Sequence, residues 1–260
     1  MSNTSETRST TVHSVDRAIS ILQVLARRGA VGVTPISEEL GVHKSTIFRL
    51  LATLEARGLV EQNASRGQYQ LGYGVIQLAA GATRKHDISV TSRPICMALA
   101  DEVGETVNIV INDGAETITI DQVIGSAEIT SVNWVGQRSP LHTTASGKVF
   151  LATMRPEERR HILDRGLERY TEETVVDPKR LEEQLAEIRE LGYAYSVDEH
   201  EIGLAGVAAP IRSIGGGVIA AVVVSGPSFR ITSENAAELA EHVLAAAASI
   251  SERNGFPKAE

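Results

Sequence analysis

The sequence predicts an α+β protein of two modules, and three observations lead to that prediction. Up to about residue 57, apolar residues recur at the spacing of a helix. Residues 59–71 change to the pattern of two short strands around a turn. Beyond about residue 93, strands in hairpins are followed by amphipathic helices, as expected for an antiparallel sheet covered by helices. The 260 residues, 42% of them hydrophobic and 22% charged, exclude a disordered chain and suffice for two domains.

Three helices are expected in the first module, after a flexible polar tail at residues 1–11. The first is predicted over residues 15–28, where apolar residues share one helical face: Val15, Ile19, Leu22 and Leu25. Ser14 can cap its start and Gly29 can end it. Thr34 then serves as the N-cap of a short second helix, because the following proline loses no hydrogen bond at the first helical position.

The third helix, predicted over residues 44–57, carries the main functional pattern. Its apolar stripe consists of Ile47, Leu50, Leu51 and Leu54. With the short helix before it and a turn at Gly41, it predicts a helix-turn-helix over about residues 36–55. Polar and basic residues gather at its start: His43, Lys44, Ser45, Thr46 and Arg49. Such residues reach base edges and phosphates in a recognition helix, although a capped, solvated helix end has the same composition.

A hairpin follows the third helix directly, with strands expected at residues 59–62 and 68–71. This arrangement predicts the wing of a winged helix-turn-helix domain over residues 12–73. Arg66 at the tip of the hairpin either contacts DNA or is an ordinary turn residue.

The charge distribution favours nucleic acid as the partner of the first module only. Residues 1–86 carry ten Lys or Arg and six Asp or Glu, a net charge of +4. The remaining residues carry a net charge of −12, so the net charge of −8 conceals a basic module.

The second module is predicted to be an α+β domain at residues 93–255, joined to the first by a linker helix at residues 74–92. Asn112-Asp113-Gly114 predicts a tight hairpin turn. Strands are expected at residues 106–111, 117–123, 193–197, 206–212 and 218–225, and helices at 147–154, 156–165, 178–191 and 233–251. The charged cluster Asp198-Glu199-His200-Glu201 is expected to form a solvated loop.

Small residues before the helix at 147–154 predict an anion-binding site: Thr144, Ala145, Ser146 and Gly147. Backbone N–H groups at such a helix start suit a carboxylate. A phosphate loop is not expected, because the first glycine of that motif is absent and Val149 replaces its Ser or Thr. The histidines lack the spacing of metal ligands, so no metal site, no cofactor and no catalytic residue is predicted.

The polar chain start lacks the apolar segment of a signal peptide, and no apolar run reaches the roughly 18 residues of a membrane helix. Cys96 is the single cysteine, which excludes an internal disulfide framework. We therefore expect a cytoplasmic protein without membrane contact.

Six segments of the chain resemble the IclR family of bacterial transcriptional regulators. They are SVDRAISILQVLARRG, ISEELGVHKSTIFRLLATLEARGLVEQ, YQLGYGVIQLA, LHTTASGKVFLA, GYAYSVDEHEIGLAGVAAPI and VVVSGPSFRIT. The resemblance implies a GAF-like effector-binding domain in the second half. It also implies a cleft between residues 144–147 and positions on three strands: Ser196, Asp198, Gly206, Val223 and Ser225. Gly206 and Val223 supply no polar side chain, which argues against a very small, highly polar effector; Trp134 either covers the cleft or packs in the core.

These features together predict a sequence-specific DNA-binding transcriptional regulator. A small-molecule effector, with a carboxylic acid as the expected class, would control its affinity for double-stranded operator DNA. The resemblance further implies either a homodimer or a tetramer built as a dimer of dimers. It also implies repression, the commoner habit of the family. The alternatives are a small-molecule-processing enzyme with an appended DNA-binding domain and a constitutive DNA-binding protein with a vestigial sensor.

Overall fold

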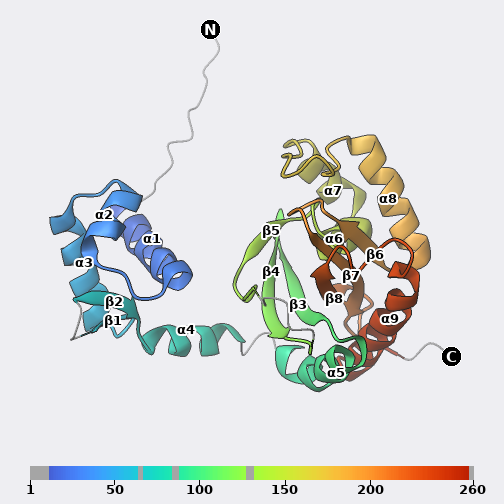
Figure 1. The fold of residues 1–260 in the computed structure, drawn as a ribbon, viewed down its shortest axis with the longest axis horizontal. Helices are drawn as coiled ribbons and strands as arrows, with labels where there is room; N and C mark the ends of the chain where they lie inside the picture. Colours follow the sequence, from blue (N-terminus) through green and yellow to red (C-terminus); the bar gives the residue numbers. More distant parts are fainter. Residues whose placement is uncertain (1–11, 64–66, 84–87, 127–131, 258–260) are drawn as a thin grey trace, which may run out of the picture. The chain divides into compact units, whose positions relative to one another are not determined.

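The computed structural model describes residues 12–63, 67–83, 88–126 and 132–257 of the 260-residue chain. The chain forms two compact units, Met1–His86 and Asp87–Glu260 (Figure 1). The α+β class is confirmed, and each unit has the architecture expected of it.

The first unit is a winged helix-turn-helix followed by one further helix. Its elements are α1 (His13–Arg28), α2 (Val33–Leu40), α3 (Lys44–Ala56), β1 (Val60–Asn63), β2 (Gln68–Leu71) and α4 (Gly74–Thr83). β1 and β2 pair in antiparallel register, and Val31 adds one bridge to Tyr69. This hairpin is the expected wing; its tip, with Arg66, lies outside the described residues.

Two details at helix starts differ from expectation. α1 begins at His13 without a side-chain cap, so Ser14 is not its N-cap. Val15 and Ile19 are half exposed, because the core packs against the second half of α1 through Ile21, Val24 and Leu25. α2 begins at Val33 after an extended Gly32, so Thr34 lies inside the first turn rather than at the cap. The proline is tolerated one position later because the first turn needs no N–H donors.

The second unit is built around a six-stranded, wholly antiparallel sheet of order β5-β4-β3-β8-β7-β6. The strands are β3 (Thr106–Asp113), β4 (Glu116–Val123), β5 (Arg138–Pro140), β6 (Ala194–Val197), β7 (Leu204–Arg212) and β8 (Val218–Pro227). The helices are α5 (Ile88–Val103), α6 (Ala145–Thr153), α7 (Pro156–Leu163), α8 (Pro178–Leu191) and α9 (Ala236–Arg253). The short edge strand β5 was not expected from the sequence.

Helices cover both faces of the sheet, and strand alternation decides which side chains each face presents (Figure 1). Val107 and Ile109 pack in the core beneath α5 and α9. Val110 and Val223 belong to the core beneath α6 and α8. Asn108 stands between Val107 and Ile109, so it faces the α6 side. Part of that face is left open as a pocket.

The segment expected as one linker helix contains α4 and the first residues of α5, with 84–87 outside the described residues. α5 begins at Ile88, before the expected boundary between the linker and the second domain at residue 93, and Pro94 lies inside it. The turn before the proline is held by burial of Ile88 and Ser92, and by hydroxyl bonds to backbone carbonyls. In the part of the chain that the structure describes, no helix is long and apolar enough to cross a membrane.

Candidate nucleic-acid interface and effector pocket

The start of α3 presents an exposed polar face opposite its buried stripe. His43 is the N-cap, and its Nδ1 accepts a 3.4 Å hydrogen bond from the Ser45 N–H. Lys44, Ser45 and Arg49 are exposed, and Thr46 is half buried. His43 and Ser45 are therefore exposed and also form the hydrogen bond that caps the helix. The buried stripe on the other side of α3 includes Ile47, Leu51 and Leu54.

Phe48 also lies exposed on this face, with 57% of its surface accessible. It follows Lys44 by one helical turn and precedes Arg49, so its ring lies among the polar candidates. The helical pattern contained the clue, since Phe48 falls outside the apolar stripe, but the sequence interpretation passed over it.

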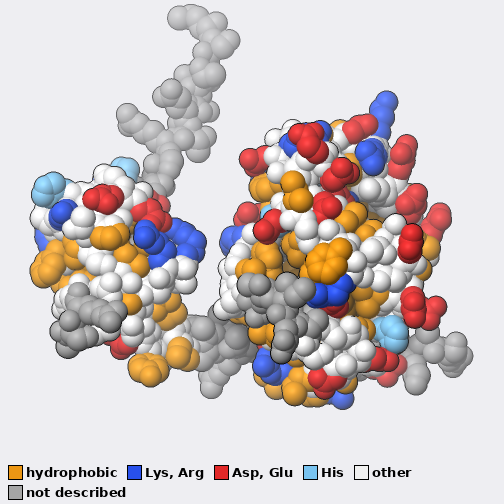
Figure 2. Space-filling view, in the orientation of Figure 1, with side chains coloured by type: hydrophobic (Ala, Val, Ile, Leu, Met, Phe, Trp, Pro, Cys, Tyr) orange, Lys and Arg blue, Asp and Glu red, His pale blue; other side chains and the backbone are white. Residues whose placement is uncertain are grey.

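Two of the arginines counted in the basic module are engaged in ion pairs. Arg27 and Arg28 each lie 2.9 Å from a different carboxylate oxygen of Glu39 and connect α1 to α2. Arg28, followed by Arg27, lowers the pKa of Glu39. In Figure 2, Lys and Arg side chains stand out on the first unit, whereas Asp and Glu are spread over the visible face of the second.

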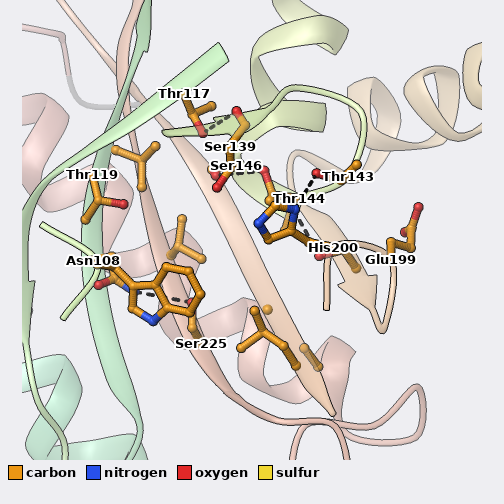
Figure 3. Close-up of a pocket in the computed structure, with 18 residues that line it drawn as sticks. Asn108, Thr117, Thr119, Ser139, Thr143, Thr144, Ser146, Glu199, His200 and Ser225 are labelled. Carbon is orange, nitrogen blue, oxygen red and sulfur yellow. Dashed lines mark hydrogen bonds between the residues drawn. The ribbon is translucent and has the colours of Figure 1, made fainter. Parts of the chain in front are cut away.

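The second unit contains a pocket of about 620 Å³ of empty space, including its open mouth. It lies between the start of α6 and the polar ends of the strands (Figure 3). Seven of the nine expected positions line it: Thr144, Ala145, Ser146, Ser196, Gly206, Val223 and Ser225. Trp134 lines the pocket too, which decides between the two positions considered for it.

Most backbone donors at the start of α6 already have partners. Thr144 is the N-cap, and its Oγ1 accepts from the Gly147 N–H at 3.1 Å. The Ala145 N–H donates to Ser196 Oγ at 3.0 Å. Among the described residues, no acceptor pairs with the Ser146 N–H. The Ser146 N–H is therefore the free donor of this helix start, and the Ser146 hydroxyl, 3.4 Å from Thr144 Oγ1, is the other polar group that it offers to a ligand.

Gly147 and Asp198 do not line the pocket. A Cβ at Gly147 would lie 2.2 Å from the Leu141 carbonyl oxygen, so glycine allows α6 to pack closely on the preceding loop. Asp198 adopts a positive φ of 55°, and its carboxylate accepts from the Gly203 N–H at 2.7 Å. Both residues shape the structure around the pocket.

A buried ion pair joins α6 to the loop after β6. Lys148 is 1% exposed, and its Nζ lies 2.5 Å from Glu199 Oε1 and 2.9 Å from Gln184 Oε1. Burial lowers the pKa of Lys148, and Glu199 opposes that shift. Glu199 and His200 are thus part of a packed pocket wall, and the expectation of a solvated loop at residues 198–201 is wrong for these two.

The sequence interpretation missed several polar residues that line the pocket: Asn108, Thr117, Thr119, Ser139, Glu199 and His200. His200 Nδ1 lies 3.1 Å from Thr143 Oγ1, and burial lowers the pKa of this histidine, so the imidazole is neutral at pH 7. Asn108 could have been noticed as the one polar residue within the apolar strand VNIVI. In the described residues, no three His, Cys, Asp or Glu side chains gather as a metal site.

Comparison with known proteins identifies the family. Residues 14–64 match the IclR helix-turn-helix domain, and residues 80–252 match the bacterial transcriptional regulator IclR C-terminal domain. The chain is 35% identical over 245 residues to the HTH-type transcriptional repressor AllR of Escherichia coli K12, covering 94% of this chain and 90% of AllR. It is 33% identical over 243 residues to the transcriptional repressor IclR of the same strain, covering 92% and 89%.

Solved structures agree with these matches. The Thermotoga maritima IclR structure has a TM-score of 0.78 at 29% identity and covers 95% of this chain and 100% of its own. An IclR homolog from Microbacterium hydrocarbonoxydans, complexed with 4-hydroxybenzoate, has a TM-score of 0.80 at 25% identity, covering 92% and 98%. The chain belongs to the IclR family of bacterial transcriptional regulators and is a DNA-binding protein with a C-terminal effector domain.

Proposed function

We propose that this regulator represses transcription by placing α3 in the major groove of an operator, and that a small carboxylic acid in the pocket changes its DNA affinity. The observation that carries the proposal is the exposed face at the start of α3, where Lys44, Ser45 and Arg49 stand opposite the stripe that packs in the core. A helix that is buried on one side and polar at its exposed N-terminal end is suited to reading base edges. The names of AllR and IclR support repression.

Each exposed residue suits a different DNA group. Arg49 and Lys44 can pair with guanine O6 and N7 or with phosphates, and Ser45 and Thr46 suit phosphates. The exposed ring of Phe48 is suited to a thymine methyl group. Thr34 on α2, together with His43 and Arg66, would contact the phosphate backbone of the DNA and so fix the position of α3 along the operator.

The effector would bind with its carboxylate at the start of α6. The Ser146 N–H and hydroxyl lie where the helix dipole favours negative charge. Ser196, Gly206, Val223 and Ser225 form the facing wall. The bound acid of the Microbacterium homolog supports this ligand class. The acid would act by binding one arrangement of the DNA-binding units better than another.

Apolar side chains exposed on the first unit support a homodimer. Val12 just before α1, and Val15 and Ile19 on it, are exposed, as are Ile76 and Leu78 on α4. Pairing through such surfaces would give the two-fold symmetry that a palindromic operator requires. Two such dimers would associate into a tetramer. We expect the protein to act in the cytoplasm.

A non-enzymatic role accounts best for the polar groups of the pocket. The Thr143–His200 pair is the closest approach to a nucleophile and base, but Thr143 Oγ1 also donates to the Pro140 carbonyl at 3.1 Å. Turnover of a bound acid by the purified chain would favour the alternative of an enzyme with an appended DNA-binding domain.

A gel-shift titration of the full chain tests the proposal, with DNA flanking its own gene as the probe. We expect specific binding whose affinity falls steeply with salt, and release by one member of a panel of small carboxylic acids. Equal affinity for flanking and random DNA would refute operator recognition. Specific binding that no acid alters would refute the effector assignment alone.

A further inference from the structure

The pocket has a second polar end, away from the start of α6. There Asn108 on β3 lies beside Ser225 on β8, and its Nδ2 donates to Ser225 Oγ at 3.3 Å. Figure 3 places this pair on the opposite side of the pocket from Thr144 and Ser146. A ligand that spans the pocket would meet donors at one end and the Asn108 amide at the other.

Asn108 has one atom that the fold does not use. The side chain is 5% exposed, and its Oδ1 is buried without a hydrogen-bond partner among the described residues. Nearly all buried polar atoms in proteins are paired, so this exception needs an explanation. Packing does not supply one, since the neighbouring Val110 and Val223 would accommodate an apolar side chain of similar size.

The charge of the pocket wall restricts the ligand group that can approach. Glu199 is the one carboxylate residue among those that line the pocket, and it already pairs with Lys148. Among the described residues that line the pocket, no uncompensated negative side chain is present to attract an ammonium group. A neutral N–H or O–H group suits the free oxygen better than a charged one.

We infer that Asn108 Oδ1 is a specificity determinant that accepts a hydrogen bond from a neutral N–H or O–H group of the effector. This inference rests on the proposed function and deepens it. The ligand class becomes a carboxylic acid with a hydroxyl or amide group at its far end. An acid too short to span the pocket leaves Asn108 Oδ1 unpaired and binds weakly.

Calorimetric titration of the full chain with matched acids tests this assignment. The probes are benzoate, 4-hydroxybenzoate and 4-methoxybenzoate, and the aliphatic set of pentanoate, 5-hydroxypentanoate and 5-methoxypentanoate. In at least one set, we expect the hydroxy acid to bind about 10-fold or more tightly than the methoxy acid, because only the hydroxyl can donate to Asn108. The comparison needs no variant, so it holds even if a substitution prevents folding.

Two variants locate the effect. Asn108→Leu should remove the preference for the hydroxy acid while leaving the affinity for the unsubstituted acid within about threefold. Ser146→Ala should weaken all three acids of a set equally, because it acts at the carboxylate end. Unchanged DNA binding in the absence of acid shows that each variant is folded.

Several results would overturn the assignment. Equal binding of the methoxy and hydroxy acids in both sets would overturn the role of Asn108. A preference for the hydroxy acid that persists in Asn108→Leu would overturn it too. Binding of 4-hydroxybenzamide that depends on Asn108, without binding of any acid, would keep Asn108 and refute the carboxylate. Binding of none of these compounds would overturn both.

Discussion

Two helix starts in this protein have similar local structure and opposite surroundings. α3 follows the N-cap His43 and α6 follows the N-cap Thr144, and each cap side chain accepts a hydrogen bond from a first-turn N–H. The first residues of α3 are exposed, whereas residues 145–152 of α6 are all buried. The chemistry of the two sites is alike and their access to water differs.

This difference teaches that burial selects the partner of a polar helix start. An exposed start can meet a long polyanion through many contacts that salt screens. A buried start can meet only a molecule small enough to enter. There, each missing hydrogen bond costs more, because water does not replace it. The predictions below separate these two situations.

The largest effect is expected at the exposed start. Arg49→Ala should weaken operator binding about 100-fold or more, since losing a base or phosphate contact costs about 1–3 kcal/mol in each of two half-sites. Gel shifts at fixed salt measure the loss. Arg57→Ala removes the same charge at the far end of α3 and should change affinity much less. Equal losses would mean that net charge alone, rather than the helix start, determines binding.

The next effect concerns stability and contrasts two lysines. Lys148→Met should lower the free energy of unfolding by about 3 kcal/mol, because it leaves Glu199 buried without its partner. Lys44→Met, at the exposed start, should change it by less than about 0.5 kcal/mol. Urea unfolding followed by far-UV circular dichroism measures both units, and fluorescence of Trp134, the single tryptophan, reports on the second unit. Adding Glu199→Gln should recover part of the loss, and similar values for the two lysine variants would contradict the comparison.

Filling the buried start should separate the two functions. Ser146→Leu places a larger side chain in the pocket, so the acid that releases DNA from the wild-type chain should no longer do so. DNA affinity without acid should stay within about twofold, because Ser146 and the exposed start of α3 belong to different units. Gel shifts with and without the acid measure this. Ser146→Ala leaves the space open, so it should still release DNA, but only at a higher acid concentration than the wild-type chain. Acid-dependent release by the Leu variant would place the effector elsewhere.

The smallest effect concerns Phe48. Replacing single thymines of the bound operator by deoxyuridine removes one methyl group, and at one position in each half-site we expect about a threefold loss of affinity, the order of one buried methyl group. Phe48→Ala should abolish that sensitivity while retaining the dependence on Arg49. If every thymine can be replaced without effect, Phe48 does not read a methyl group.

Local patterns were sufficient for most elements of the fold. The α3 stripe, the glycine that ends α1 and the hairpin at Asn112-Asp113-Gly114 all depend on neighbours in sequence, and the structure has each of them. The errors are at boundaries where tertiary contacts intervene. Burial of Ile88 and Ser92 extends α5 before Pro94. Only the second half of α1 packs in the core, so Val15 and Ile19 in its first half stay exposed.

The candidate pocket was predictable only in part. Residues 144–146 follow from their place before a helix, and the strand positions came from the family resemblance. Asn108, Thr119 and His200 enter the pocket from elements far apart in the chain, and no local pattern indicates that they meet.

The sequence by itself therefore determined the two modules, the recognition helix and the family, because periodicity, turn residues and motif order are local properties. Only the tertiary structure decided that Lys148 pairs with a buried Glu199 and that Ser196 Oγ accepts the hydrogen bond of the Ala145 N–H. It also decided that Asn108 Oδ1 stays buried without a hydrogen-bond partner among the described residues. Those outcomes depend on which strands become neighbours and which face each side chain takes. A shift of strand register by one residue would turn Asn108 and Ser196 to the opposite face of the sheet.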